Sequence, residues 1–334
     1  MDKSELRLDP LTREWTVFNE NRSLPPSQVT DGAEELAPSP FLAGLERFSS
    51  HTLFHAEGAD GWQVRVVPNR VPVLGIEANP SGTEDGVYSR LGGFGAHEIV
   101  IEDPGDRRFS ELGAGEMAQV AEAWRARIED LMRDGRLTSF AVVKNEGRAA
   151  GQTVAHSISQ VVAMGIVAPA LRRKLDAARV HFAALGRSLF ADIVETELRV
   201  RERVVCENAG FVVFCPYAAR TPFEIAIWPK RHGADFHRIT AEEVEQLGDA
   251  LRCAMVRLDA ALNSPAYHLV LTTAPSAGRV TDEWPMMHEE FCWHIHVLPR
   301  LHPVGGIEIA TGCHVNGVWP EVAAEFLRGR EVQQ

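Results

Sequence analysis

The chain has 334 residues, 45% of them hydrophobic and 24% charged, and carries a formal net charge of −12. This composition is typical of a globular protein with room for two modules, and the acidic excess excludes a general nucleic-acid binder, whose surface would be basic. The start is polar and the apolar runs are short, so we expect neither a secretory signal nor a membrane span. The five cysteines form no CxxC pair and no even framework, which favours a reducing cytoplasm.

The first half predicts a strand, a helix and two further strands. HEIVIEDPGDRRFSEL at 97–112 begins as an alternating strand and ends in a polar turn before a phenylalanine. The helix at 116–132 carries an apolar stripe at Met117, Val120, Trp124, Ile128 and Leu131. Alternating strands follow at 139–147 and 156–164, and one long helical segment is expected from 168 to about 203.

The second half repeats this order. FEIAIWPKRHGADFHRI at 223–239 is again a strand, a polar turn and a phenylalanine. A helix at 241–262 opens with the capping box Thr240 and Glu243, and strands are expected at 266–274 and 292–300. Such a rhythm can arise by chance, but the matching features favour duplication. We therefore predict an α+β fold of two tandem modules, residues 1–195 and 196–334, each an antiparallel sheet with packed helices.

The strand CWHIHVLPR at 292–300 is the richest in chemistry. Alternation places Cys292, His294 and His296 on one face and Trp293, Ile295 and Val297 on the core face. A neutral imidazole can attack phosphorus, and Arg300 could clamp a phosphate. The same three residues, with His288 as a further candidate, could instead hold a metal ion. A solvated strand face is the remaining alternative.

The corresponding first-half stretch is TVAHSISQVVA at 153–163. On a strand, His156, Ile158 and Gln160 share one face, so an isoleucine stands between two polar residues suited to phosphate chemistry. Asn145 ends the preceding strand in a turn whose amides could meet a phosphate. Arg22 and Asn69 are weaker candidates for contact with an anion, and His97 is equally explained as a satisfied core histidine.

At this point the sequence resembles the galactose-1-phosphate uridylyltransferase family of the histidine triad superfamily. The resemblance rests on stretches spread along the chain: LRLDPLTREWTVFNENRSLPP, VRVVPNRVPVL, GAHEIVIEDP, VVKNEGRAAGQTVAHSISQ, FVVFCPYAARTPFEIAIWPKRHGADF and WHIHVLPRL. It implies two histidine-triad-like modules, a homodimer and a cytoplasmic nucleotidyltransferase of galactose metabolism that acts on a nucleotide sugar or sugar phosphate. Family members transfer the nucleotide through a covalent histidine intermediate.

The resemblance also exposes departures in the first half. The family's strand reads His-Pro-His followed one residue later by Gln, and its second histidine is the nucleophile; Ile158 stands at that position here. The family's CPFC zinc element corresponds to Ser39-Pro40-Phe41-Leu42, so both thiolates are lost at Ser39 and Leu42, while His97 and His156 match its histidine ligands. We therefore expect no structural zinc. The resemblance assigns nucleotide and phosphate contacts to Arg22, Asn69, Asn145, Thr153 and Gln160.

The second half departs in the opposite direction. The family has two histidines in this strand that help to bind a metal, whereas this chain has Cys292, His294 and an additional His296. His294-Ile295-His296 resembles the motif of single-module histidine triad hydrolases, which makes His294 a candidate nucleophile and His296 and His156 further catalytic candidates. The leading hypothesis is a nucleotidyltransferase, with a phosphorylase or hydrolase that uses His294 as an alternative. A nucleotide-binding protein without turnover and an inactive subunit of a hetero-oligomer are the rival hypotheses.

Overall fold

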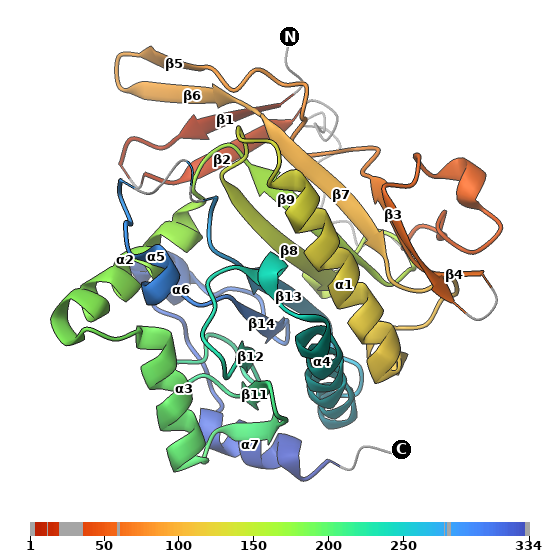
Figure 1. The fold of residues 1–334 in the computed structure, drawn as a ribbon, viewed down its shortest axis with the longest axis vertical. Coiled ribbons are helices and arrows are strands. Elements are labelled where there is room, and N and C mark those ends of the chain that lie inside the picture. Colours follow the sequence, from red (N-terminus) through yellow and green to blue (C-terminus); the bar gives the residue numbers. More distant parts are fainter. Residues whose placement is uncertain are drawn as a thin grey trace.

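The computed structural model describes residues 4–11, 13–19, 36–58, 61–276, 278 and 282–330. A ten-stranded antiparallel sheet runs through the molecule in the order β10-β11-β12-β14-β13-β8-β9-β7-β4-β3 (Figure 1). Its strands are β3 Phe54–Gly58, β4 Gly61–Pro68, β7 Gly95–Ile101, β8 Ser139–Glu146, β9 Ile158–Met164, β10 Val204–Glu207, β11 Phe211–Phe214, β12 Ile225–Pro229, β13 Tyr267–Thr272 and β14 His294–Pro299.

A second, smaller sheet has the order β2-β1-β6-β5, from β1 Ser4–Leu8, β2 Trp15–Asn19, β5 Gly82–Asp85 and β6 Tyr88–Gly92. The α-helices are α1 Ala114–Leu131, α2 Pro169–Leu185, α3 Leu189–Val200, α4 Ala241–Leu262, α5 Met287–Glu290, α6 Gly306–Thr311 and α7 Pro320–Arg328. Short 3-10 turns lie at Glu46–Phe48, Phe109–Glu111, Arg148–Ala150 and Phe236–Arg238. In the described part of the chain no helix is long and apolar enough to cross a membrane.

The large sheet displays the predicted repeat directly. Outward from its centre, the first half runs β8-β9-β7-β4 and the second half runs β13-β14-β12-β11, so equivalent strands occupy equivalent places. The halves join through the antiparallel pair β8–β13, in which Val143 lies opposite Val270. The α+β class with two tandem modules is thus confirmed. The boundary expected at residue 195 falls within α3.

One face of this sheet is covered by α1 and α4, which lie side by side (Figure 1). Phe109 and Phe236, the phenylalanines that follow the two polar turns, are fully buried beneath them. The two helices approach closely at Gly248, where a Cβ atom would stand 2.3 Å from the Ala114 carbonyl oxygen. Trp293, Ile295 and Val297 belong to this core, as the alternation predicted.

The opposite face of the sheet, called here the open face, is covered unequally. Over the second half, side chains of α2 and α3 form a buried apolar cluster with Val212, Phe214 and Trp228. Over the first half, a smaller cluster of Val67, Ile99 and Ile101 is packed only by partly buried residues. Among the described residues, the open face is therefore less covered over the first half than over the second.

The long helix expected over 168–203 is wrong in one respect. The chain forms two helices, because α2 ends at Gly186, which has a left-handed φ of 68°. A residue with a Cβ atom adopts this conformation reluctantly, so glycine here ends a helix and turns the chain. The turn lets α3 pack on the second half while α2 extends toward β13 and β14.

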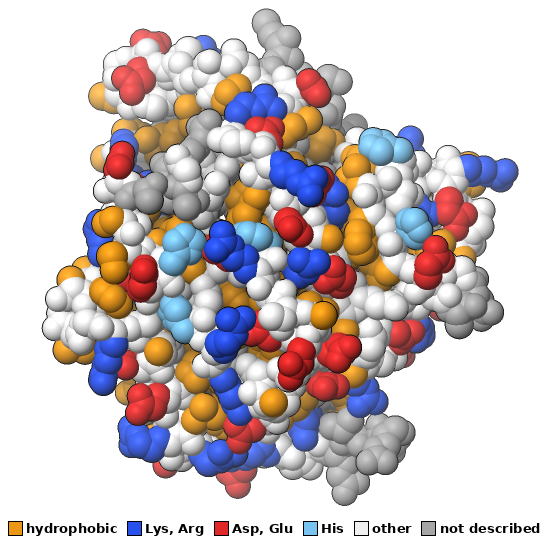
Figure 2. Space-filling view, viewed as in Figure 1, with side chains coloured by type: hydrophobic (Ala, Val, Ile, Leu, Met, Phe, Trp, Pro, Cys, Tyr) orange, Lys and Arg blue, Asp and Glu red, His pale blue; other side chains and the backbone are white. Residues whose placement is uncertain are grey.

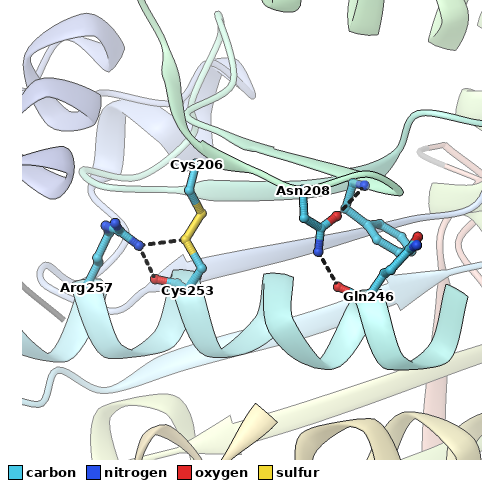
Figure 3. The surroundings of a disulfide bond; sticks show 6 residues. Cys206, Asn208, Gln246, Cys253 and Arg257 are labelled. Atoms are coloured by element: carbon cyan, nitrogen blue, oxygen red, sulfur yellow. Dashed lines mark hydrogen bonds between the residues drawn. A yellow bond between two sulfur atoms is a disulfide. The ribbon is translucent and has the colours of Figure 1, made fainter. Parts of the chain in front are cut away.

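The cysteine pattern indicated no disulfide framework, but one pair of cysteines is bonded. Cys206 of β10 and Cys253 of α4 form a disulfide across 47 residues (Figure 3). Beside it, Arg257 Nη1 lies 2.7 Å from Cys253 Sγ, and the Asn208 side chain donates to the Gln246 carbonyl. Spacing along the sequence could not reveal this pair, because the two cysteines meet only when α4 packs on the edge strand.

The surface agrees with the composition. Acidic and basic side chains are interspersed over the face shown in Figure 2, with no large patch of a single sign. This mixture does not form the basic stripe on which a nucleic-acid backbone would lie.

Candidate active site

His156 lies just before β9, where it is 3% exposed. Its Nε2–H donates to the Asp103 carbonyl oxygen at 2.9 Å, and its Nδ1 lies 2.8 Å from Ser39 Oγ. The Phe41 ring packs edge-on against the imidazole. Burial lowers the pKa of His156. With both nitrogens engaged, this neutral histidine is a structural residue, and its candidate catalytic role has no support in the geometry.

Replacing Ser39 with alanine is expected to destabilise the protein by about 1–2 kcal/mol, because it leaves the buried Nδ1 of His156 without its hydroxyl partner. Urea unfolding followed by circular dichroism measures this loss. The exposed Ser81 is a suitable control position, and Ser81→Ala should leave the free energy of unfolding within about 0.5 kcal/mol. An unchanged midpoint for Ser39→Ala would contradict the structural role of His156.

Ile158 is the first residue of β9 and points to the open face. It pairs with Ile101 of β7 and packs with the small apolar cluster of Val67, Ile99 and Ile101. The strand beneath it alternates as predicted, since Ser159, Val161 and Ala163 face the helices and are buried. Ile158 thus contributes to local apolar packing, but its side chain cannot act as a nucleophile.

The backbone at Ile158 rests on a fully buried ion network on the helix side of the sheet. Lys144 Nζ lies 2.7 Å from Glu102 Oε2, 3.1 Å from Glu146 Oε2 and 2.9 Å from Ser157 Oγ. It also donates to the Ile158 carbonyl oxygen at 3.3 Å. Burial alone would lower the pKa of Lys144, but the two carboxylates outweigh it and raise the pKa. The ammonium therefore stays charged and fixes the start of β9.

His97 faces the open side of β7 and is not near His156. It lies opposite Val162, whereas Ile158 lies opposite Ile101, four residues further along β7 and therefore roughly 13 Å away. His97 Nδ1 accepts from the Val73 N–H, and Gln160 Oε1 lies 2.7 Å from its Nε2. The structure does not bring together the two histidines that the resemblance assigned to one zinc site. His97 instead positions Gln160 on the open face.

Asn69 and Asn145 are both placed on this face. Asn69 Nδ2 lies 3.1 Å from His97 Nε2, so Asn69, His97 and Gln160 form one polar group. Asn145 follows Lys144, the residue opposite Ser159, and is therefore beside Ile158. Its Oδ1 accepts from His268 Nδ1 at 3.0 Å.

His268 of β13 was missed by the sequence reasoning. It lies opposite Asn145 in the β8–β13 pair and is half-buried on the open face. The available signal is the alternation in AYHLVLTTA, which puts His268 and Thr272 on one face. Burial lowers the pKa of His268, and the nearby Arg300 guanidinium lowers it further.

His296 is held by a carboxylate. Its Nδ1–H donates to Glu224 Oε1 at 2.8 Å, and Arg220 binds the same carboxylate at 2.6 Å. Burial opposes ionisation of Glu224, but these two partners lower its pKa to about 2. The His296 ring packs against Trp228, and the side chain is 14% exposed. The His296 ring is thus held in one orientation by Glu224, and contact with Trp228 leaves little of it exposed.

His294 is 1% exposed, and both of its nitrogens are occupied. Its Nδ1–H donates to the Cys292 carbonyl oxygen at 2.9 Å, and its Nε2 accepts from Lys174 Nζ at 2.6 Å. Lys174 also donates to Thr272 Oγ1. Burial lowers the pKa of His294 well below its usual value, and the neighbouring Lys174 adds to this effect. Lys174 therefore blocks the lone pair that a nucleophile or a metal ligand would need.

Cys292 does not complete a metal site with these histidines. It precedes β14 and belongs to the buried apolar cluster on α2 and α3, and burial raises the pKa of its thiol to about 11. Among the described residues, no three His, Cys, Asp or Glu side chains form a group that could hold a metal ion. His288 contacts Asp235 instead. The set Cys292, His294 and His296 is a shared strand face without the geometry of a ligand set.

The other residues that the sequence suggested for substrate contact are Arg300, Thr153 and Arg22. Arg300 follows β14 and lies close enough to His268 to influence its pKa, while its Nε is buried without a hydrogen-bond partner. Thr153 is exposed in the loop before His156, and its carbonyl accepts from the Ala37 N–H. Arg22 lies outside the described residues. The structure thus places Asn69, Asn145, Gln160, His268, His296 and Arg300 on the open face, spread over strands from β4 to β14.

Comparison with known proteins shows which proteins this chain is similar to. Residues 174–332 match the profile described as "Galactose-1-phosphate uridyl transferase, C-terminal domain". The chain is 31% identical over 334 residues to ADP-glucose phosphorylase of Arabidopsis thaliana, covering 97% of this chain and 92% of that one. It is 24% identical over 332 residues to galactose-1-phosphate uridylyltransferase of Thermotoga maritima, covering 98% and 99% of the two chains.

Solved structures agree. The crystal structure of the Arabidopsis thaliana ADP-glucose phosphorylase with bound ADP-glucose superposes with a TM-score of 0.78 at 29% identity, covering 98% of this chain and 100% of that chain. A structure described as "Structure of uridylyltransferase" has a TM-score of 0.78 at 26% identity and covers 97% of each chain. The relatives therefore match both modules, and the small N-terminal sheet is included in the match.

Proposed function

Because this chain belongs to the galactose-1-phosphate uridylyltransferase family, we propose that it binds a nucleotide sugar on the open face and transfers its nucleotidyl group to phosphate or a sugar phosphate. The observation that carries the proposal is the set of polar groups on the open face near Ile158: the amides of Asn145 and Gln160, the imidazole of His268, and the Arg300 guanidinium that acts on His268. Amides and a guanidinium suit an anionic pyrophosphate, and an imidazole suits attack at phosphorus.

Phosphorolysis of an ADP-sugar is the first reaction to test. The relative with 31% identity over nearly the whole chain is an ADP-glucose phosphorylase, and its structure contains ADP-glucose. In this reaction a phosphate oxygen becomes bonded to the α-phosphorus, and the sugar 1-phosphate leaves with the electron pair of the broken bond. A homodimer, as the resemblance implies, is part of the proposal.

A binding protein without turnover is the second candidate, and Ile158 favours it. The resemblance places this isoleucine where the family has its nucleophile, and the two histidines with the strongest sequence case, His156 and His294, have both ring nitrogens engaged. Loss of a nucleophile costs orders of magnitude in rate even where binding survives.

Phosphorus NMR distinguishes the two candidates. The protein is mixed with ADP-glucose or UDP-glucose, alone, with inorganic phosphate, or with a hexose 1-phosphate. We expect loss of the nucleotide sugar that depends on the acceptor, with a nucleoside diphosphate and sugar 1-phosphate formed from phosphate. Broadened ligand signals without consumption would support the binding protein. Neither consumption nor broadening for any nucleotide sugar would overturn both candidates.

A further inference from the structure

Among the described histidines of the open face, His268 and His296 each have Nδ1 held by an acceptor, and no hydrogen bond is found at Nε2 of either; His268 is the one that lies beside Asn145. Its Nδ1–H is fixed by Asn145 Oδ1 at 3.0 Å, and in the described part of the chain no hydrogen bond engages its Nε2. It is half-buried, so the ring can be reached. A histidine with Nδ1 held by an acceptor presents a lone pair on Nε2 in a fixed direction.

The position of His268 relates it to Ile158. Both residues point to the open face, and Asn145 lies between them on β8, beside Ile158 and opposite His268. Two strand spacings separate the backbones of positions 158 and 268, which is about 10 Å. A phosphoryl group seated above Asn145 would therefore lie within reach of an imidazole extending from position 268.

The charge around His268 suits an anionic substrate. Arg300 is the charged group that acts on its pKa, and the guanidinium Nε of Arg300 is buried without a partner. A guanidinium beside an imidazole keeps the ring neutral and attracts phosphate oxygens. His296, by comparison, is bonded to the carboxylate of Glu224 and enclosed by Trp228 and His294.

We propose that His268, oriented by Asn145, is the nucleophile of this protein and takes the part that Ile158 cannot perform; this inference rests on the proposed nucleotidyl transfer. The His268 Nε2 lone pair forms a bond to the α-phosphorus of the nucleotide sugar. The bond from that phosphorus to the bridging oxygen breaks, and the sugar 1-phosphate leaves with the electron pair. The proton on Nδ1 remains on the ring and is held by Asn145.

The second half of the reaction restores the histidine. An oxygen of inorganic phosphate or of a hexose 1-phosphate forms a bond to the same phosphorus. The phosphorus–nitrogen bond breaks, and its electron pair returns to Nε2. Since each step inverts the configuration at phosphorus, the complete reaction retains it. Direct attack by the acceptor in a single step would invert it.

Covalent labelling tests the proposal. The protein is incubated with a nucleotide sugar carrying a radioactive α-phosphate, without acceptor, and quenched at alkaline pH, where a phosphorus–nitrogen bond on histidine survives. We expect a labelled protein that loses its label on brief acid treatment. His268→Asn and His268→Gln should lose the label and lower the turnover rate by roughly 10³-fold or more. His55→Asn, which changes an exposed histidine of β3, should keep both.

Asn145→Asp gives a readout that depends on the orientation of the ring. A carboxylate at this position raises the pKa of His268, so the acidic limb of the kcat/KM profile should move to higher pH. The two His268 variants must keep the thermal unfolding midpoint of the unmodified protein, so that loss of label is not caused by unfolding. Asparagine and glutamine differ in shape, so a folding defect in one variant leaves the other as a test.

The outcomes separate the inference from the proposed function. Turnover without label, or with inverted configuration at phosphorus, would overturn the role of His268 and leave nucleotidyl transfer intact. Label kept in His268→Asn but lost in His296→Asn would assign the nucleophile to His296. Absence of any turnover by the unmodified protein would remove both the proposed function and this inference.

Discussion

Replacing Lys144 with methionine is expected to lower the free energy of unfolding by about 3–5 kcal/mol, because it leaves the carboxylates of Glu102 and Glu146 buried without their cation. Methionine has nearly the length of the lysine stem, so the loss is mainly electrostatic rather than a cavity. The measurement is guanidinium unfolding of the two proteins at pH 7.

A double variant separates charge from packing. Lys144→Met together with Glu102→Gln removes one of the stranded charges and should recover part of the loss. Because Lys144 also holds the Ser157 hydroxyl and the Ile158 carbonyl, the single variant should loosen the start of β9 and weaken nucleotide-sugar binding as well. A loss below about 1 kcal/mol would show that the network contributes little to the fold.

The fold could be predicted because its signals are periodic. Strand alternation and helical stripes occur twice in the same order, and the ten-stranded sheet shows the same repeat in the order of its strands. The helix break at Gly186 was missed because both flanking segments continue the helical pattern. The Cys206–Cys253 pair was missed because it depends on packing of α4 against β10.

The site was less predictable. Alternation predicts which face of the sheet a side chain occupies, but it does not predict the residue at which strand pairing begins. His156 and Cys292 continue the alternation of their strands, yet both precede the strand and are buried. Lys174 lies on an amphipathic helix, where a lysine usually faces solvent. Its contact with His294 exists only because α2 crosses the open face near β13 and β14.

The two halves of the open face therefore differ for physical reasons. In the second half, α2 and α3 cover the sheet and bury His294, and Lys174 Nζ lies against the Nε2 atom of His294. In the first half, none of the described helices lies on this face, and Asn145, Ile158 and Gln160 are partly exposed. A duplicated module can thus keep its strands in both copies while only one copy offers its face to a ligand.

The pH dependence of stability should report the state of Lys174. Burial, with Arg220 adding and Glu224 opposing, lowers the pKa of Lys174 from 10.5 to about 8. Between these values the unfolded chain binds a proton that the folded protein does not, so the free energy of unfolding rises with pH from about 8 to about 10.5. Below pH 8 both states hold the proton, and this contribution is flat.

Comparison with Lys174→Met isolates this effect from other titrating groups. Between pH 8 and pH 10.5, the free energy of unfolding of the unmodified protein should rise relative to that of the variant. For a pKa shift of this size, the rise is at most about 3 kcal/mol. Urea unfolding at several pH values measures the difference, and parallel curves for the two proteins would contradict the buried ammonium. At neutral pH that ammonium is the predominant form, and it donates to His294 Nε2. Neither phosphorus nor a metal ion can then use this nitrogen, so the proposed nucleotidyl transfer requires a different imidazole.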